Sequence, residues 1–118
     1  MNWRLDGLIA NVPQTAPNGA VNEETIFRFR QKENRVWAEY AGGLIERGYL
    51  VGLVTGNRFV FRYCQMQFDG TFDGGKSDCR LERSPEGLVR IVENFEWASR
   101  PGEKGTNIIQ QLPERPTG

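Results

Sequence analysis

The sequence predicts an all-β fold, in which eight antiparallel up-and-down strands close into a small barrel. Turn-forming residues recur at nearly even spacing, among them Glu33-Asn34, Gly42-Gly43, Gly56-Asn57 and Pro101-Gly102. The segments between these turns are rich in Val, Ile, Phe, Tyr, Trp and Leu, which favour strands. The chain has 118 residues, enough for one domain, and closure protects the edges of so short a sheet.

Each expected strand is a run of β-forming residues that ends at a turn signal. In chain order the strands are expected at residues 3–11, 25–32, 35–41, 44–55, 58–68, 76–84, 88–98 and 106–112. The connection at 13–19 contains two prolines and a glycine, so we expect it to leave the ladder and cover one end of the barrel. Residues 1–112 are expected to form the single domain, and residues 113–118 a flexible tail.

Tight turns also predict which residues lie opposite one another. The expected cross-strand pairs are Arg28 with Glu39, Trp37 with Gly48, Val51 with Arg62, Cys64 with Cys79, Lys76 with Glu96, and Glu82 with Arg90. Two of these, Lys76 with Glu96 and Glu82 with Arg90, place opposite charges together on one face of the same hairpin, which supports its register.

The face that then points inward is mostly apolar but also carries polar and charged side chains. These are Arg62, Glu93, Arg47, Arg83, Tyr49 and Tyr40, the candidate ligand-binding residues. A charge in a dry core is costly unless it is paired. In one interpretation, the arginines recognise an anionic ligand such as a carboxylate or a phosphate. In the other, Arg47 and Arg83 reach water at opposite rims, and Arg62 with Glu93 forms a structural ion pair.

Catalytic and metal chemistry find little support in the sequence. Glu93 is a weak candidate for a catalytic acid or base, because its apolar neighbours on the strand would raise the pKa of its carboxyl, while Arg62 would lower it. The sequence contains no histidine and only two cysteines. We therefore expect a binding protein rather than an enzyme, with no metal and no cofactor.

The two cysteines, Cys64 and Cys79, are expected to be direct cross-strand neighbours. That arrangement allows a disulfide, whereas a cytoplasmic location favours two reduced, packed thiols.

A group of aromatic side chains is expected on the outer face, where it would form an apolar patch. Its members Trp37, Phe59, Phe61 and Tyr63 suggest a homodimer through this face. The alternative is that Trp37 and Phe61 only shield glycines within one subunit.

Composition excludes several classes of partner. Fifteen basic and fifteen acidic residues balance, so the chain has no one-sided field for nucleic acid or a membrane surface. It has no long apolar run and no visible signal peptide, and we expect a cytoplasmic location.

Three segments carry a resemblance to a known family: VNEETIF at 21–27, QKENRVWAEYAGG at 31–43 and GTNII at 105–109. Over about residues 20–112, the chain resembles a family of small bacterial single-domain proteins that are often labelled N-acetylglutamate synthase. The resemblance implies an avidin- or lipocalin-like barrel of the calycin type and supplies no catalytic residues. We do not expect the activity in that label, since the sequence has neither a Gly-rich pyrophosphate loop nor a helix following one.

The function expected from these observations is binding of a small ligand, an anion in one interpretation, inside the barrel. Two alternatives stay open. One is a small-metabolite enzyme of the isomerase or cyclase type that uses an interior pair of Glu93 and Arg62. The other is a protein-interaction module that acts through the outer aromatic face.

Overall fold

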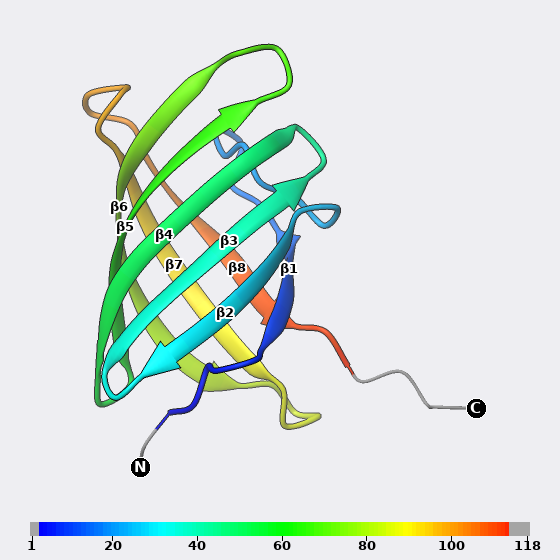
Figure 1. Cartoon of the computed structure of the whole chain (residues 1–118), viewed down its shortest axis with the longest axis vertical. Coiled ribbons are helices and arrows are strands. Elements are labelled where there is room, and N and C mark those ends of the chain that lie inside the picture. The colour runs from blue at the N-terminus through cyan, green and yellow to red at the C-terminus, as the bar shows by residue number, and fades with distance from the viewer. Residues whose placement is uncertain (1–2, 114–118) are drawn as a thin grey trace.

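Eight antiparallel strands form one closed barrel in the computed structural model, which describes residues 3–113 (Figure 1). The strands are β1 (Ile9–Gln14), β2 (Ile26–Lys32), β3 (Arg35–Gly42), β4 (Ile45–Thr55), β5 (Arg58–Gln67), β6 (Phe72–Arg83), β7 (Val89–Trp97) and β8 (Lys104–Gln111). Each pairs with the next, and β8 pairs with β1 to close the barrel. The predicted fold class and the number of strands are therefore confirmed. Of the predicted tail, residues 114–118 lie outside the described residues.

Three of the predicted strand registers are confirmed. Arg28 lies opposite Glu39 in the β2–β3 pair, and Val51 lies opposite Arg62 in the β4–β5 pair. In the β6–β7 pair, Lys76 lies opposite Glu96. These hairpins have turns whose length the sequence indicated correctly, and turn length sets the register of a hairpin.

Two other predicted registers are wrong. In the β3–β4 pair, Trp37 lies opposite Val51 instead of Gly48, because the turn falls at Gly43-Leu44, one residue later than predicted, and the register shifts once more between Tyr40 and Gly42. In the β5–β6 pair, Cys64 lies opposite Gly74 instead of Cys79. Strand β6 begins early, at Phe72, because a tight turn at residues 67–71 is closed by backbone hydrogen bonds from Gln67 and Gly70.

These two errors invert β4 and β5 relative to the prediction. Each displaces the pairing by an odd number of residues, which moves every side chain to the opposite face of its strand. The second error cancels the inversion that the first one introduced, so the residues of β6 and β7 that were predicted to lie on the inward face of the sheet do so. As a result Leu50, Phe59 and Phe61 are buried, whereas Arg62 and Cys64 are exposed.

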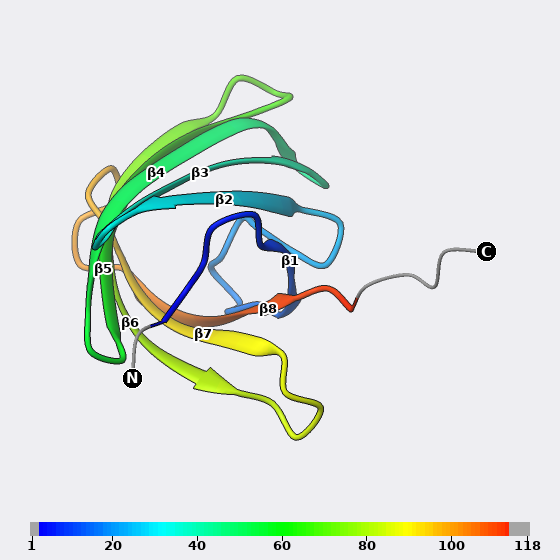
Figure 2. The ribbon, with the colours of Figure 1, turned by 60° about the horizontal axis from the view of Figure 1, so that its bottom comes forward.

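The N-terminal segment closes one end of the barrel instead of forming a strand. The first strand was predicted at residues 3–11, but residues 3–8 cross the end near the β2–β3 turn, as Figure 2 shows. Leu5 is fully buried there, and its amide donates to Oε1 of Gln31 at 2.7 Å. Nε2 of Gln31 in turn donates to the carbonyl of Trp3. The apolar side chains of this segment therefore complete the core rather than extend the sheet.

The connection between β1 and β2 covers the opposite end, as its prolines and glycine predicted (Figure 1). We call residues 15–25 the covering loop. The β3–β4, β5–β6 and β7–β8 turns share this end, because alternate connections of an up-and-down sheet lie on the same side. No helix within residues 3–113 is long and apolar enough to cross a membrane.

Candidate functional site

A small, partly open cavity of about 20 Å³ lies between the barrel interior and the covering loop. It has room for one water molecule. Gly19, Ala20 and Val21 of the covering loop form one wall. Six aromatic side chains form most of the rest: Phe27, Tyr40, Phe61, Tyr63, Phe95 and Trp97. Gln65, Glu93 and Asn107 add polar groups, so this cavity combines an apolar enclosure with a few convergent hydrogen-bonding groups, as ligand sites do.

Alternation along β5 places its aromatic residues inside the barrel. Phe61 packs against Tyr63 with ring centroids 6.1 Å apart, and Tyr63 packs against Trp97 at 5.9 Å. Tyr40 of β3 stacks on Phe27 at 4.4 Å and donates its hydroxyl to Oε1 of Gln65 at 2.8 Å. The aromatic wall is therefore a continuous packed surface drawn from β2, β3, β5 and β7.

Tyr40 reaches this position because Gly48 lies opposite it. A Cβ atom on Gly48 would overlap the Tyr40 ring. Burial, with a smaller contribution from the nearby Glu93 carboxylate, raises the pKa of Tyr40 far above its ordinary value. The hydroxyl is therefore a neutral group of the site.

Glu93 is the buried carboxyl group of the cavity. Its Oε2 accepts a hydrogen bond from Oγ of Ser77 at 2.5 Å, and its Oε1 accepts one from Nδ2 of Asn107 at 3.1 Å. Burial raises the pKa of Glu93, and the hydrogen bonds from Ser77 and Asn107 act against that rise. Within residues 3–113 no lysine or arginine forms an ion pair with this carboxylate.

Tyr63 has a buried hydroxyl group without a hydrogen-bond partner among the described residues. It lies over Gly75, whose lack of a side chain leaves space for it. Burial, followed by the nearby charges of Glu93 and Asp73, raises the pKa of this phenol well above its ordinary value. An unpaired buried hydroxyl costs about 1–3 kcal/mol, and a ligand or water in the cavity would relieve that cost.

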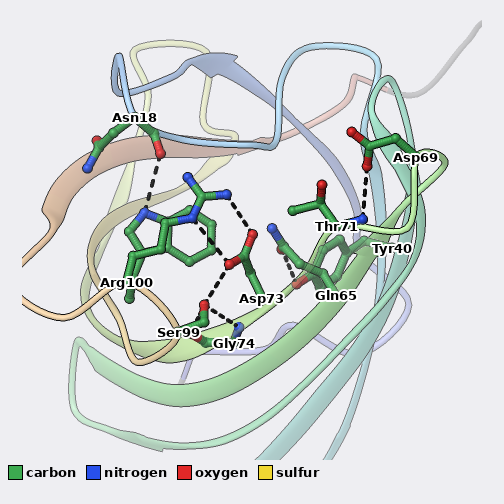
Figure 3. A network of polar contacts seen from close by, with 10 residues as sticks. Asn18, Tyr40, Gln65, Asp69, Thr71, Asp73, Gly74, Ser99 and Arg100 are labelled. Carbon is green, nitrogen blue, oxygen red and sulfur yellow. Dashed lines mark hydrogen bonds and ion pairs between the residues drawn. The ribbon is translucent and has the colours of Figure 1, made fainter.

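Few hydrogen bonds hold the covering loop over the cavity. The amide of Ala16 donates to Oδ1 of Asn107 at 2.8 Å. The carbonyl of Asn18 accepts from Nε1 of Trp97 at 3.3 Å, as Figure 3 shows, and its side-chain amide donates to the carbonyl of Lys104. Asn107 therefore holds the covering loop with one atom of its amide and the Glu93 carboxylate with the other.

A second polar cluster braces the rim of the same end. Nη2 and Nε of Arg100 donate to the two carboxylate oxygens of Asp73 at 2.6 and 3.2 Å, and Oγ of Ser99 donates to Asp73 at 2.6 Å (Figure 3). The Arg100 guanidinium also lies 4.5 Å from the centre of the Trp97 ring. Arg100 thus joins the rim of the barrel to the tryptophan that holds the covering loop.

The structure brings together only two of the predicted site residues, Glu93 and Tyr40. Arg47, Tyr49 and Arg62 are exposed on the outer surface, which corrects their predicted interior position, whereas Arg83 is exposed at one end of the barrel, as the interpretation with arginines at the rims predicted for it. For the residues of β4 and β5 the cause is the inversion of those strands. Arg83, at the end of β6, donates to the carbonyl of Gly87 and lies over Trp3. The interior pair of Glu93 and Arg62 does not form, nor do arginines line the cavity.

Sequence reasoning missed most of the polar and aromatic groups of the site: Tyr63, Gln65, Trp97, Asn107 and Asn18. Gln65 and Tyr63 lie on the inverted strand β5. The signal that could have found them is the complete absence of charge at alternate positions 59, 61, 63 and 65.

The cysteines and the outer surface also differ from the predictions. Both cysteines are free; Cys64 is exposed and Cys79 is buried, where burial and the Glu93 charge raise the pKa of its thiol. Of the residues predicted for a dimer, Phe59 and Phe61 are buried and Tyr63 packs against the core, whereas Trp37 is 43 % exposed. Trp37 instead adjoins Val51, Leu53 and Val60 on the outer surface.

A closed eight-stranded barrel with a pocket at one end belongs to the class of barrels that can hold one small ligand. The chain belongs to the avidin-like protein family, whose model matches residues 3–112. No curated protein and no solved structure matches it. The avidin- or lipocalin-like barrel implied by the resemblance agrees with this family, and nothing supports the N-acetylglutamate synthase label.

Proposed function

We propose that this protein binds a small organic molecule in the cavity between the barrel and the covering loop. The observation that carries the proposal is that two costly buried groups belong to residues that line one cavity: the partnerless Tyr63 hydroxyl, and the hydrogen-bonded Glu93 carboxylate, which has no counter-charge among the described residues. Both are costly to keep in an empty protein interior, and both offer hydrogen bonds to a guest. Membership of the avidin-like family supports binding inside a barrel.

Ligand entry requires the covering loop to move. The cavity of about 20 Å³ accommodates one water, so a larger guest needs the space that Gly19, Ala20 and Val21 now occupy. The loop is tied down by side-chain and backbone hydrogen bonds rather than by a strand ladder. Displacing it exposes a preformed aromatic wall, while the barrel strands keep their pairing.

An anionic ligand, one of the expectations from the sequence, has no support in the site. That expectation rested on interior arginines, but Arg47 and Arg62 face the outer surface, Arg83 is exposed at the end of the barrel near Trp3, and no arginine lines the cavity. The enzymatic alternative loses the interior pair of Glu93 and Arg62 for the same reason. A homodimer remains a prediction, which now rests on Trp37 and its apolar neighbours.

Thermal denaturation with a panel of small metabolites, containing cations, neutral molecules and anions, tests the proposed function. A ligand that binds only the folded state stabilises it by about 2.7 kcal/mol at a hundredfold excess over Kd. Val21→Phe fills the cavity from the covering loop, and Val51→Phe is the matched control, since Val51 is 64 % exposed on the outer surface.

We expect at least one ligand to raise the melting temperature of the wild type and of Val51→Phe but not of Val21→Phe. A panel that shifts nothing, or a shift that Val21→Phe retains, would overturn the proposed function.

A further inference from the structure

The charge distribution of the cavity narrows the class of ligand. Among the residues that line the cavity, Glu93 is the only one with an acidic side chain, and none is a lysine or an arginine. Arg100, a cation at the rim of the same end, already forms a bidentate pair with Asp73. A negative charge on Glu93 therefore has no internal counter-charge among the described residues, and a cationic ligand would supply one.

The aromatic wall favours a positive charge as well. Six aromatic rings line the same small space as Glu93. The face of an aromatic ring attracts a cation, by about 0.5–1 kcal/mol at exposed sites and about 2 kcal/mol or more where water is excluded. Groups of aromatic rings are an arrangement by which proteins hold organic ammonium groups. An anion would instead meet the Glu93 carboxylate, which would repel it.

The hydrogen-bonding groups indicate a ligand with N–H donors. Each oxygen of Glu93 accepts one hydrogen bond from the protein, which leaves acceptor capacity on both oxygens. The oxygen of Tyr63 has no partner among the described residues and can accept a further bond. A primary or secondary ammonium group carries the donors and the charge that these atoms lack.

We propose that the ligand of this barrel is a small organic ammonium compound, whose cationic nitrogen binds the Glu93 carboxylate within the aromatic wall. This inference rests on the proposed function, because it names the ligand class of the same cavity. It also gives Asn107 a role: a ligand nitrogen that competes for Glu93 weakens the contact from Asn107, whose other amide atom holds the covering loop. Binding at the carboxylate is thereby linked to the position of the loop.

The test uses three probes of one shape and different charge: benzylammonium, benzyl alcohol and benzoate. Trp97 lines the cavity, so its fluorescence reports occupancy once Trp3 and Trp37 are replaced by phenylalanine. Isothermal titration calorimetry on the unmodified protein gives the affinities. Glu93→Gln removes the charge, and Glu96→Gln is the matched control, because Glu96 is an outward-facing carboxylate on the same strand with its side chain 42 % exposed.

We expect benzylammonium to bind at least tenfold more tightly than benzyl alcohol, and benzoate more weakly than either. Glu93→Gln is expected to lower the benzylammonium affinity at least tenfold without lowering that of benzyl alcohol, and Glu96→Gln to change neither. Tighter binding of the alcohol or benzoate, or an unchanged ammonium affinity in Glu93→Gln, would overturn the ammonium assignment while leaving ligand binding intact. If no probe binds and the metabolite panel also shifts nothing, both proposals fail.

Discussion

Replacing Arg100 by methionine removes the guanidinium that braces the rim of the barrel. Asp73 would remain with a side chain that is 5 % exposed and with one hydrogen bond from Ser99. In the intact protein, burial raises the pKa of Asp73, but the hydrogen bonds from Arg100 and Ser99 outweigh burial, so its pKa lies below the ordinary value. Without Arg100, burial would have the largest effect on the pKa of Asp73, and the buried carboxylate would lack a counter-charge.

The expected loss of stability follows from the exposure of the two partners. Breaking a fully buried ion pair costs about 3–5 kcal/mol. The Arg100 side chain is 33 % exposed, so water solvates part of the site, and hydrogen bonds to charged groups contribute about 1.5–3 kcal/mol. We expect Arg100→Met to lower the free energy of unfolding by about 2–3 kcal/mol at pH 7. With an m value of about 1.5 kcal/mol/M, the urea midpoint falls by about 1.3–2 M.

Urea denaturation at pH 7 and pH 3 measures this effect, and a second ion pair provides the control. Arg58 and Asp78 form the same bidentate contact, but their side chains are 65 % and 56 % exposed. Arg58→Met should therefore leave the midpoint close to that of the wild type. The effect of Arg100→Met should shrink as the pH falls through the ordinary Asp range, because a lowered carboxyl pKa stabilises only the ionised state.

A double-mutant cycle with Asp73→Asn measures the interaction energy between Arg100 and Asp73 apart from their contacts with other residues. The double variant strands no charge, so it should be more stable than the sum of the two single losses predicts. A midpoint of Arg100→Met within about 0.3 M of the wild type, or equal losses for Arg100→Met and Arg58→Met, would refute the reasoning.

Three further predictions concern the site itself. Because burial raises the pKa of Glu93, the native state loses stability as the pH rises from about 4.5 to the raised pKa, by about 1.4 kcal/mol for each pH unit in that interval. Glu93→Gln should therefore gain stability relative to the wild type between pH 4 and pH 8 in urea titrations; a difference independent of pH would contradict this. Gly48→Ala should lower the melting temperature and shift the near-ultraviolet tyrosine signal, because a Cβ there displaces the Tyr40 ring; an unchanged signal would show that the ring is free to move. Asn107→Leu should accelerate amide exchange at Ala16, measured by mass spectrometry, while exchange in β4 and β5 stays slow; equal acceleration everywhere would indicate global destabilisation.

The fold could be predicted from the sequence because its turns are local. Glu33-Asn34 and Gly56-Asn57 each fix a hairpin through two residues, and both registers are correct. The β3–β4 register could not be predicted, since the turn uses Gly43-Leu44 instead of the adjacent Gly42-Gly43, and a bulge adds one residue to β4 just after that turn. The early start of β6 was missed because two closely spaced glycine turns, at Asp69-Gly70 and Gly74-Gly75, compete in the sequence, and only the first of them forms the turn.

The candidate site depended on which face of β4 and β5 points inward, and hydrophobicity alone does not settle that question. Both faces of β5 are largely apolar: Val60 and Met66 lie on one side, Phe59 and Phe61 on the other. Charge and residue size do distinguish them. The outward face carries Arg62, whose burial without a partner would cost several kcal/mol, whereas the inward face of β5 carries no charge.

The glycines of β4 point to the same orientation. Gly48 and Gly52 lie four residues apart, so they share one face of the strand. A Cβ at Gly48 would overlap the ring of Tyr40, and one at Gly52 would overlap the carbonyl of Val60 and the Cβ of Phe61. The Tyr40 ring fills the space that Gly48 leaves, and Gly52 allows β5 to approach closely; such tight packing is found in a protein interior rather than against solvent. The glycine spacing and the uncharged face of β5 together determine the inward face, and with it the aromatic wall that encloses Glu93.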